Sequence, residues 1–176
     1  GIARIAFLLD RYKIVKNPII FSVGARLLRV SNKLRAGEFI FPINVSPREV
    51  LEILRIGKQV VRRITIAEGL SKIQVIEIIK NTKGLTGAVN VNLEEGEILP
   101  ETYFFSFGDS RDSVVKRMKN GMTTLLSILW PGRSPDLPIS NIKQAVILAS
   151  IVEKETGLKN ERSRVAGVFI NRLRLN

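Results

Sequence analysis

Two helix-start signals of the same kind, 25 residues apart, constrain the fold of this 176-residue chain more than any other feature. Residues Ser46–Glu49 and Ser71–Gln74 are both capping boxes, in which the Ser side chain and the Glu or Gln three residues later bind free backbone N–H groups of a new helix. A short segment that favours β structure precedes each box, Glu38–Phe41 in the first copy and Arg63–Ile66 in the second. The repeated order of strand, turn and capped helix predicts a small α+β module whose helices pack on one face of a sheet.

The remaining patterns are mainly helical. Apolar residues from Ile2 to Leu9 recur at helical spacing, and Asn17-Pro18 supplies the next helix with a cap and a first-turn proline. Further helices are predicted over about 109–129, 141–156 and 160–174, with a break at Trp130–Pro135 between the first two. The sequence therefore predicts an α+β chain that is rich in helix toward its C-terminal end.

Composition limits the chemistry that the chain can perform. It contains neither His nor Cys, which excludes Ser-His-Asp triads, Cys-His nucleophiles, zinc fingers and disulfide frameworks. Acid–base chemistry must then come from carboxylates, Lys or Tyr. The net charge of +12 can steer a protein to nucleic acid, anionic lipid or another polyanion, and it can equally be a solvated basic surface. Because no stretch of about 18 apolar residues is present, we expect these residues to be soluble rather than to span a membrane.

The helix predicted over 141–156 carries the candidate catalytic group. At about 100° per residue, Ile142, Ala149 and Val152 share an apolar face, and Glu153 lies roughly 20° from Ile142 on the helical wheel. Glu155 lies roughly 200° further round and projects away. Since burial disfavours the charged form of a carboxylate, we expect Glu153 to be a ready proton donor, as cleavage at a glycosidic oxygen requires. The alternative is that Glu153 reaches the surface or pairs with a Lys or Arg.

Several segments, one of them containing this glutamate, carry a specific resemblance. They are Leu148–Thr156, Glu161–Arg162, Val165–Arg174, Leu34–Phe39, Glu95–Tyr103 and Ile66–Gly69. Together they closely resemble the motifs of the endolytic murein transglycosylases, the YceG-like family. The resemblance covers essentially the whole chain and is weakest over residues 1–30.

The resemblance implies two domains. Residues 1–58 would form a LysM-like module, incomplete on its N-terminal side, and residues 59–176 a partial, helix-rich YceG-like catalytic domain that in the family continues beyond this chain. The activity implied is that of an endolytic lytic transglycosylase, which cleaves the bond between N-acetylmuramic acid and N-acetylglucosamine in peptidoglycan without water and leaves a 1,6-anhydro-muramoyl end. A bacterial protein is implied, anchored by an N-terminal membrane-spanning helix absent from this chain, with its catalytic domain facing the cell wall and cell-wall synthases as candidate partners.

The resemblance also assigns site residues. The catalytic glutamate of the family falls on Glu153, which would act first as general acid and then as base, so that one carboxylate suffices and neither a metal nor a cofactor is expected. At 99–101 this chain has Leu-Pro-Glu, whereas Phe-Pro-Asp is commoner in the family. The candidate substrate-binding residues are Glu155, Asn171, Arg172, Tyr103 and Glu101.

Two other classes of function remain open from the sequence. One is a non-catalytic peptidoglycan-binding module in which the LysM-like half binds the glycan. The other is a nucleic-acid binder, which rests on charge alone. The sequence has no aromatic platform with basic neighbours and no groove-reading motif, so no specific nucleic acid is expected as a partner.

Overall fold

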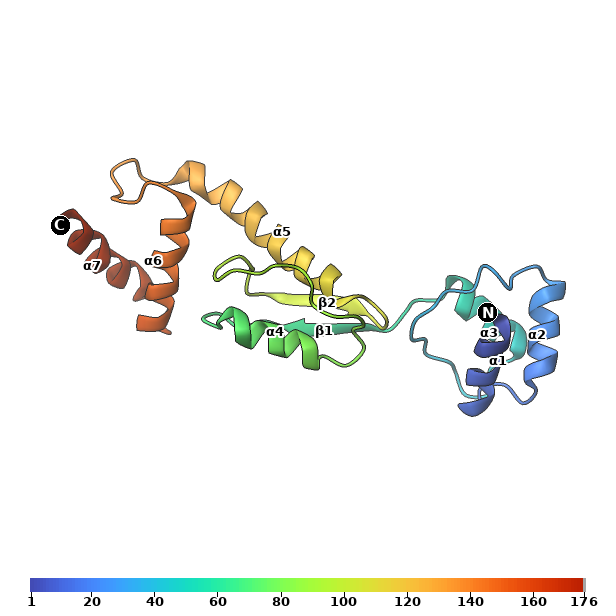
Figure 1. The fold of residues 1–176 in the computed structure, drawn as a ribbon. Helices are drawn as coiled ribbons and strands as arrows, with labels where there is room; N and C mark the ends of the chain where they lie inside the picture. The colour runs from blue at the N-terminus through green and yellow to red at the C-terminus, as the bar shows by residue number, and fades with distance from the viewer. Residues whose placement is uncertain (176) are drawn as a thin grey trace. The chain divides into compact units, whose positions relative to one another are not determined.

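The structure is a computed structural model of the chain, and it describes residues 1–175. Over these residues the chain is α+β, as the sequence predicts, with seven α-helices, one short 3₁₀ helix and a two-stranded sheet (Figure 1). No helix in this range is long and apolar enough to cross a membrane. In chain order the elements are α1 (Ile2–Arg11), α2 (Pro18–Leu27), α3 (Pro47–Ile56), β1 (Val61–Thr65), α4 (Lys72–Asn81), β2 (Thr102–Ser106), α5 (Arg111–Leu129), η1 (Trp130–Gly132), α6 (Ile142–Glu155) and α7 (Arg162–Leu175).

The chain divides into two compact units, and each is described by itself. The N-terminal unit comprises Gly1–Arg62 with Ser106–Gly108, and the second unit comprises Arg63–Phe105 and the chain from Asp109 onward. In the N-terminal unit, α1 packs on α2, and apolar side chains of α1, α2 and α3 form one core. Its buried members are Ala6, Leu9, Val15, Phe21, Ala25, Val50, Leu51 and Leu54.

The helix starts of the N-terminal unit form as the sequence predicts. Asn17 caps α2, because its Oδ1 accepts hydrogen bonds from the backbone N–H groups of Ile19 and Ile20. At α3 the capping box is complete: the backbone N–H of Glu49 donates to Ser46 Oγ at 3.3 Å, and the backbone N–H of Ser46 donates to Glu49 Oε2 at 2.8 Å.

The strand predicted over Glu38–Phe41 is wrong. Phe39 forms only an isolated antiparallel bridge with Gln59. Glu38 is instead held by Arg62, whose Nε and Nη2 each donate to its carboxylate at 2.6 Å; these hydrogen bonds lower the pKa of Glu38. The repeat is therefore confirmed for its capped helices, since α3 and α4 begin 25 residues apart, but not for its first strand. A LysM-like module over residues 1–58 stays a prediction.

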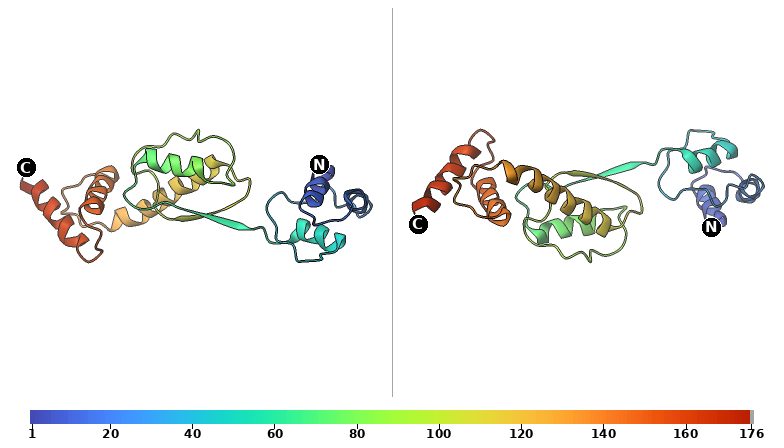
Figure 2. Two further views of the ribbon diagram at one scale, coloured as in Figure 1. Left: turned by 90° about the horizontal axis from the view of Figure 1, so that it is seen from below. Right: turned by 90° about the horizontal axis from the view of Figure 1, so that it is seen from above.

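The second unit has two layers, with α4 and α5 packed on one face of the sheet (Figure 2). Ile64 on β1 and Phe105 on β2 belong to the same buried cluster as Val75 and Ile79 of α4 and Met118 of α5. Thr65 at the end of β1 lies opposite Thr102 at the start of β2, with 2.9 Å between their hydroxyl oxygens, so the strands run antiparallel. The side chains of alternate residues lie on opposite faces of a sheet, so Ile64 and Phe105 are buried against the helices while Val61 and Phe104 are exposed on the other face.

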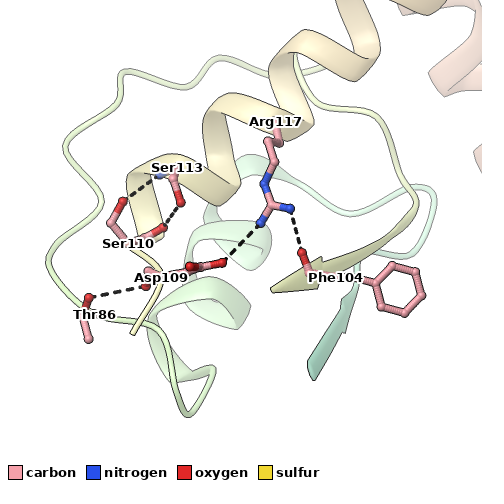
Figure 3. Close-up of polar contacts among 6 residues, drawn as sticks. All are labelled: Thr86, Phe104, Asp109, Ser110, Ser113 and Arg117. Atoms are coloured by element: carbon pink, nitrogen blue, oxygen red, sulfur yellow. Dashed lines mark hydrogen bonds and ion pairs between the residues drawn. The ribbon is translucent and has the colours of Figure 1, made fainter. Parts of the chain in front are cut away.

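Polar contacts fasten the N-terminal end of α5 to the rest of the second unit (Figure 3). Ser110 caps the helix by accepting a hydrogen bond from the backbone N–H of Ser113 at 3.1 Å. Nη1 of Arg117 donates to the carbonyl of Phe104 on β2 at 2.7 Å, and Nη2 lies 4.0 Å from Oδ2 of Asp109. The bond from Arg117 to Phe104 ties α5 to β2.

The first turn of α5 also holds the loop that follows α4. The guanidinium of Arg111 donates to the carbonyls of Ile79, Lys80 and Gly87, and so binds carbonyls at the end of α4. Asp112 Oδ1 accepts hydrogen bonds from the backbone N–H groups of Asn90 at 2.7 Å and of Val91 at 3.2 Å. These bonds hold Gly87, Asn90 and Val91 in place, just before the loop over 93–100.

Candidate active site

A pocket of about 550 Å³ lies within the second unit. Three segments form most of its lining: the turn after β1 together with the start of α4, the loop over 93–100, and one side of α6; Met122 of α5 completes it. The polar and charged side chains among its lining include Glu68, Lys72, Glu95, Ser150 and Glu153. The pocket is therefore made by segments far apart in the sequence, which α4, α5 and the sheet bring together.

One stripe of α6 faces the pocket. Val146, Ala149, Ser150 and Glu153 all line it, and their spacing of three and four residues places them on one side of a helix. The helix approaches the loop over 93–100 closely at Gly96. A Cβ atom there would lie 2.6 Å from Cγ1 of Val146, and φ is +77°, so glycine allows both the backbone conformation and the close approach.

Glu153 lies in the last turn of α6 and is half-buried, with 26% of its side chain exposed. Nη2 of Arg162 lies 2.8 Å from its Oε2 and donates a hydrogen bond to its Oε1 at 3.1 Å. The structure thus shows the ion pair that the sequence left open as the alternative, on a helix face that also lines a pocket.

The turn between α6 and α7 places Arg162. Thr156, which is buried, donates from Oγ1 to Glu161 Oε2 at 3.0 Å and accepts from the backbone N–H of Leu158 at 3.1 Å. Arg162 follows directly as the first residue of α7. Its Nε is buried and has no hydrogen-bond partner among the residues that the structure describes, so the guanidinium is held chiefly through its contact with Glu153.

Further carboxylates share the pocket with Glu153. Glu68 lies in the turn after β1, next to Gly69, where φ is +73° and a Cβ atom would lie 3.9 Å from Cγ of Glu153. Glu95, in the loop over 93–100, reaches the start of α4, where its Oε2 accepts a hydrogen bond from the backbone N–H of Lys72 at 2.9 Å. The pocket thus offers several hydrogen-bond acceptors beside Glu153, as a neutral, hydroxyl-rich ligand needs.

Three residues that the sequence predicts to bind substrate lie on α6 and α7 but do not line the pocket. Glu155 is exposed at the end of α6, and Asn171 and Arg172 are exposed on α7. The guanidinium of Arg172 lies 5.8 Å from the centroid of the Phe169 ring. Their assignment to a substrate cleft stays a prediction.

The remaining two predicted residues lie on and before β2, also outside the lining. Tyr103 is half-buried and donates its hydroxyl to the carbonyl of Leu99 at 2.7 Å. Burial, with a smaller contribution from the charge of Glu101, raises the pKa of Tyr103. Glu101 is exposed and accepts a hydrogen bond from the backbone N–H of Thr102 at 3.0 Å. Their role in substrate binding likewise stays a prediction.

Sequence reasoning did not assign Arg162, Glu68 or Glu95 to the site. All three lie in segments that carry the family resemblance, namely Glu161–Arg162, Ile66–Gly69 and Glu95–Tyr103. Glu68 and Glu95 lie far before Glu153 in the chain, and Arg162 lies beyond the end of its helix, so helical spacing could not connect them to Glu153. Among residues 1–175, no cluster of three or more acidic side chains is arranged to hold a metal ion.

Comparisons with known proteins agree with these motifs. The sequence model of the YceG-like family matches residues 1–176. A curated relative from Streptococcus pneumoniae, named an endolytic murein transglycosylase, is 24% identical over 216 aligned residues that cover 98% of this chain and 38% of the relative. A crystal structure of a yceG-like protein from Listeria monocytogenes is 21% identical, with a TM-score of 0.47, over 98% of this chain and 66% of that one. The chain thus spans well under half the length of the curated relative.

Proposed function

Because the chain belongs to the YceG-like family, we propose that it is an endolytic peptidoglycan lytic transglycosylase whose single catalytic residue is Glu153. The observation that carries the proposal is the position of Glu153 on the wall of a 550 Å³ pocket, next to further hydrogen-bond acceptors. The activity named for the Streptococcus pneumoniae relative supports the same substrate, the glycan strands of peptidoglycan.

One carboxyl group serves both steps of the proposed reaction. In the first step Glu153 donates its proton to the glycosidic oxygen, which leaves with N-acetylglucosamine as its bond to C1 of N-acetylmuramic acid breaks. In the second step the C6 hydroxyl oxygen of the same muramic acid bonds to C1, and the Glu153 carboxylate removes the hydroxyl proton. Glu153 regains its proton, no water is consumed, and the new ends are a 1,6-anhydro ring and a free C4 hydroxyl.

Arg162 fits the second of these steps. Nη2 of Arg162, 2.8 Å from Oε2 of Glu153, holds the carboxylate in position for removal of the C6 hydroxyl proton. The first step needs a proton on the same carboxyl group, so the proposal includes loosening of the ion pair when the glycan binds. Both groups are partly exposed, so the pair is weak enough to open.

Exchange of Glu153 for glutamine tests the assignment. Glu153→Gln in the full-length protein keeps the side chain's size but removes its acidic proton, and we expect release of anhydro-muropeptides from purified sacculi to fall by roughly 10²–10⁴-fold. Glu77→Gln is the matched control, because it makes the same chemical change at an exposed position of α4 outside the pocket. Equal loss in both variants, or full activity in Glu153→Gln, would show that Glu153 is not the catalytic group.

A non-catalytic peptidoglycan-binding module is the second candidate, and the separate N-terminal unit favours it. Such a protein would pellet with sacculi and release no anhydro-muropeptides, and the Glu153→Gln exchange would leave binding unchanged. The proposal that the chain is a lytic transglycosylase also includes three further parts: a LysM-like module over residues 1–58, anchoring in the bacterial membrane with the catalytic domain toward the cell wall, and binding to cell-wall synthases.

A further inference from the structure

Helix α2 of the N-terminal unit exposes a row of large apolar side chains. Phe21 and Ala25 point into the core, whereas Ile19, Ile20 and Leu27 are 73%, 63% and 77% exposed. Val23 lies between them and is 47% exposed, and Leu28, the residue that ends the helix, is 59% exposed. We call these five residues the α2 apolar face. A row of this kind on one side of a helix is more than the isolated exposed apolar residues of an ordinary protein surface.

The chain around the α2 apolar face is positively charged throughout. Residues 11–37 contain no Asp or Glu. They contain seven cationic side chains, which are Arg11, Lys13, Lys16, Arg26, Arg29, Lys33 and Arg35. Lys16, Arg26 and Arg29 are exposed and lie next to or within α2 itself.

The acidic groups elsewhere in the N-terminal unit do not offset this charge. Glu38 is bound by Arg62, Glu49 forms the capping box with Ser46, and Glu52 lies 3.6 Å from Arg55 on the same helix. Each of these three carboxylates is thus engaged with a partner outside residues 11–37. The fourth, Asp10, directly precedes this stretch and can offset only one of its seven cations, so the chain around α2 presents a net positive field at the α2 apolar face.

We propose that the α2 apolar face and its flanking cations bind the surface of an anionic lipid bilayer. Apolar side chains that enter the boundary between headgroups and acyl chains, with Lys and Arg at the level of anionic headgroups, describe an interfacial helix. A soluble polyanion such as nucleic acid would match the charge but leave the five apolar side chains in water. With ten residues, α2 is about 15 Å long, so it lies along the surface and does not cross it.

Vesicle binding by the full chain tests this surface. The probes are vesicles of phosphatidylcholine alone and of phosphatidylcholine with phosphatidylglycerol at about three to one, in co-sedimentation at low salt and in salt near or above physiological strength. We expect binding to the anionic vesicles only, and weakening by salt because the cations are exposed. The assay measures no glycan cleavage, so its outcome is independent of the function proposed above.

Two variants and a control separate the contributions of the apolar and the cationic side chains to vesicle binding. Ile20→Ser/Leu27→Ser removes apolar groups that already face solvent, and should weaken vesicle binding on the order of a hundredfold. Lys16→Gln/Arg26→Gln should weaken it about thirtyfold. The control, Ile73→Ser/Lys143→Gln, exchanges the same kinds of exposed residue in the second unit and should bind as the unchanged chain does. Circular dichroism and thermal unfolding confirm that each variant is folded.

Three results would overturn the proposal. The first is equal binding to both kinds of vesicle, or none to either. The second is a control variant that loses as much binding as the α2 variants. The third is concentration-dependent self-association that Ile20→Ser/Leu27→Ser abolishes while vesicle binding stays unchanged, because a second copy of the chain would then cover the α2 apolar face.

Discussion

Exchange of Gly96 for alanine tests the packing that forms the pocket. At this glycine φ is +77°, and an alanine there costs about 1–2 kcal/mol in backbone conformation alone. The added Cβ would lie 2.6 Å from Cγ1 of Val146, about 1 Å closer than carbon atoms normally pack. Relieving that contact by moving α6 adds about 1–3 kcal/mol. The total loss of about 2–5 kcal/mol is a large part of the stability of an ordinary domain.

Gly87→Ala is the matched control. Its φ of +74° imposes the same backbone cost, but no atom lies within 4 Å of the added Cβ. The difference between the two variants therefore measures the contact with α6, about 1–3 kcal/mol, which corresponds to roughly 2–12 °C in the midpoint of thermal unfolding. Urea unfolding at constant pH gives the same difference without depending on the heat capacity.

A second-site exchange checks the cause. Val146→Ala removes Cγ1, so Gly96→Ala/Val146→Ala should recover most of the extra loss, whereas Gly87→Ala/Val146→Ala should show simple additivity. Gly96→Ala should also reduce release of anhydro-muropeptides, because moving α6 moves Glu153. Equal destabilisation by Gly96→Ala and Gly87→Ala would refute the packing of α6 against the loop over 93–100, and with it the pocket.

Three further predictions concern single side chains. Hydrogen bonds from the backbone N–H groups of Asn90 and Val91, the former contributing more, lower the pKa of Asp112 below its usual value of 3.8. The stability that ionised Asp112 contributes is complete above pH 3.8 and is lost as the pH falls below it. In urea unfolding, Asp112→Asn should therefore be less stable at neutral pH, and its stability should fall less in acid than that of the unchanged chain. Burial raises the pKa of Tyr103 above 10, so wild-type stability should decline as the pH rises past 10, and Tyr103→Phe should decline less in the same assay. Arg162→Lys should retain more muropeptide-releasing activity than Arg162→Leu, because only Lys keeps a cation beside the carboxylate; equal activity would remove Arg162 from the mechanism.

The parts of the fold that local sequence decides were predictable. The capping boxes at Ser46 and Ser71 fix helix starts through bonds between neighbours in the chain, and both are confirmed. The segment Glu38–Phe41 has the composition of a strand but forms only one bridge, because its contacts depend on Arg62 and Gln59, more than 15 residues away. A strand needs a partner whose position is set by the tertiary fold, which composition cannot supply.

The candidate site likewise has features that local sequence predicts and features that depend on the tertiary fold. Helical spacing alone placed Glu153 near an apolar stripe of its helix, and the structure puts it on the wall of a pocket. Nothing in that spacing could identify Glu68 and Glu95 as its neighbours, since the second unit brings them together only when α6 packs against the loop over 93–100. The ion pair with Arg162 depends on the turn that Thr156 stabilises, which the helical wheel does not describe.

We propose that Glu153 cleaves the glycan without water. A second carboxylate, Glu68, lines the same pocket. Glycoside hydrolases use two carboxylates, about 5 Å apart in retaining enzymes and about 6.5–9.5 Å apart in inverting ones. The products therefore distinguish hydrolysis from the lytic reaction more directly than the site residues do. Digestion of purified sacculi in water enriched in ¹⁸O, followed by mass spectrometry of the released ends, measures the difference. Under the proposed reaction, the released ends are 1,6-anhydro-muramoyl groups without ¹⁸O. Reducing ends that carry ¹⁸O at C1 would contradict it.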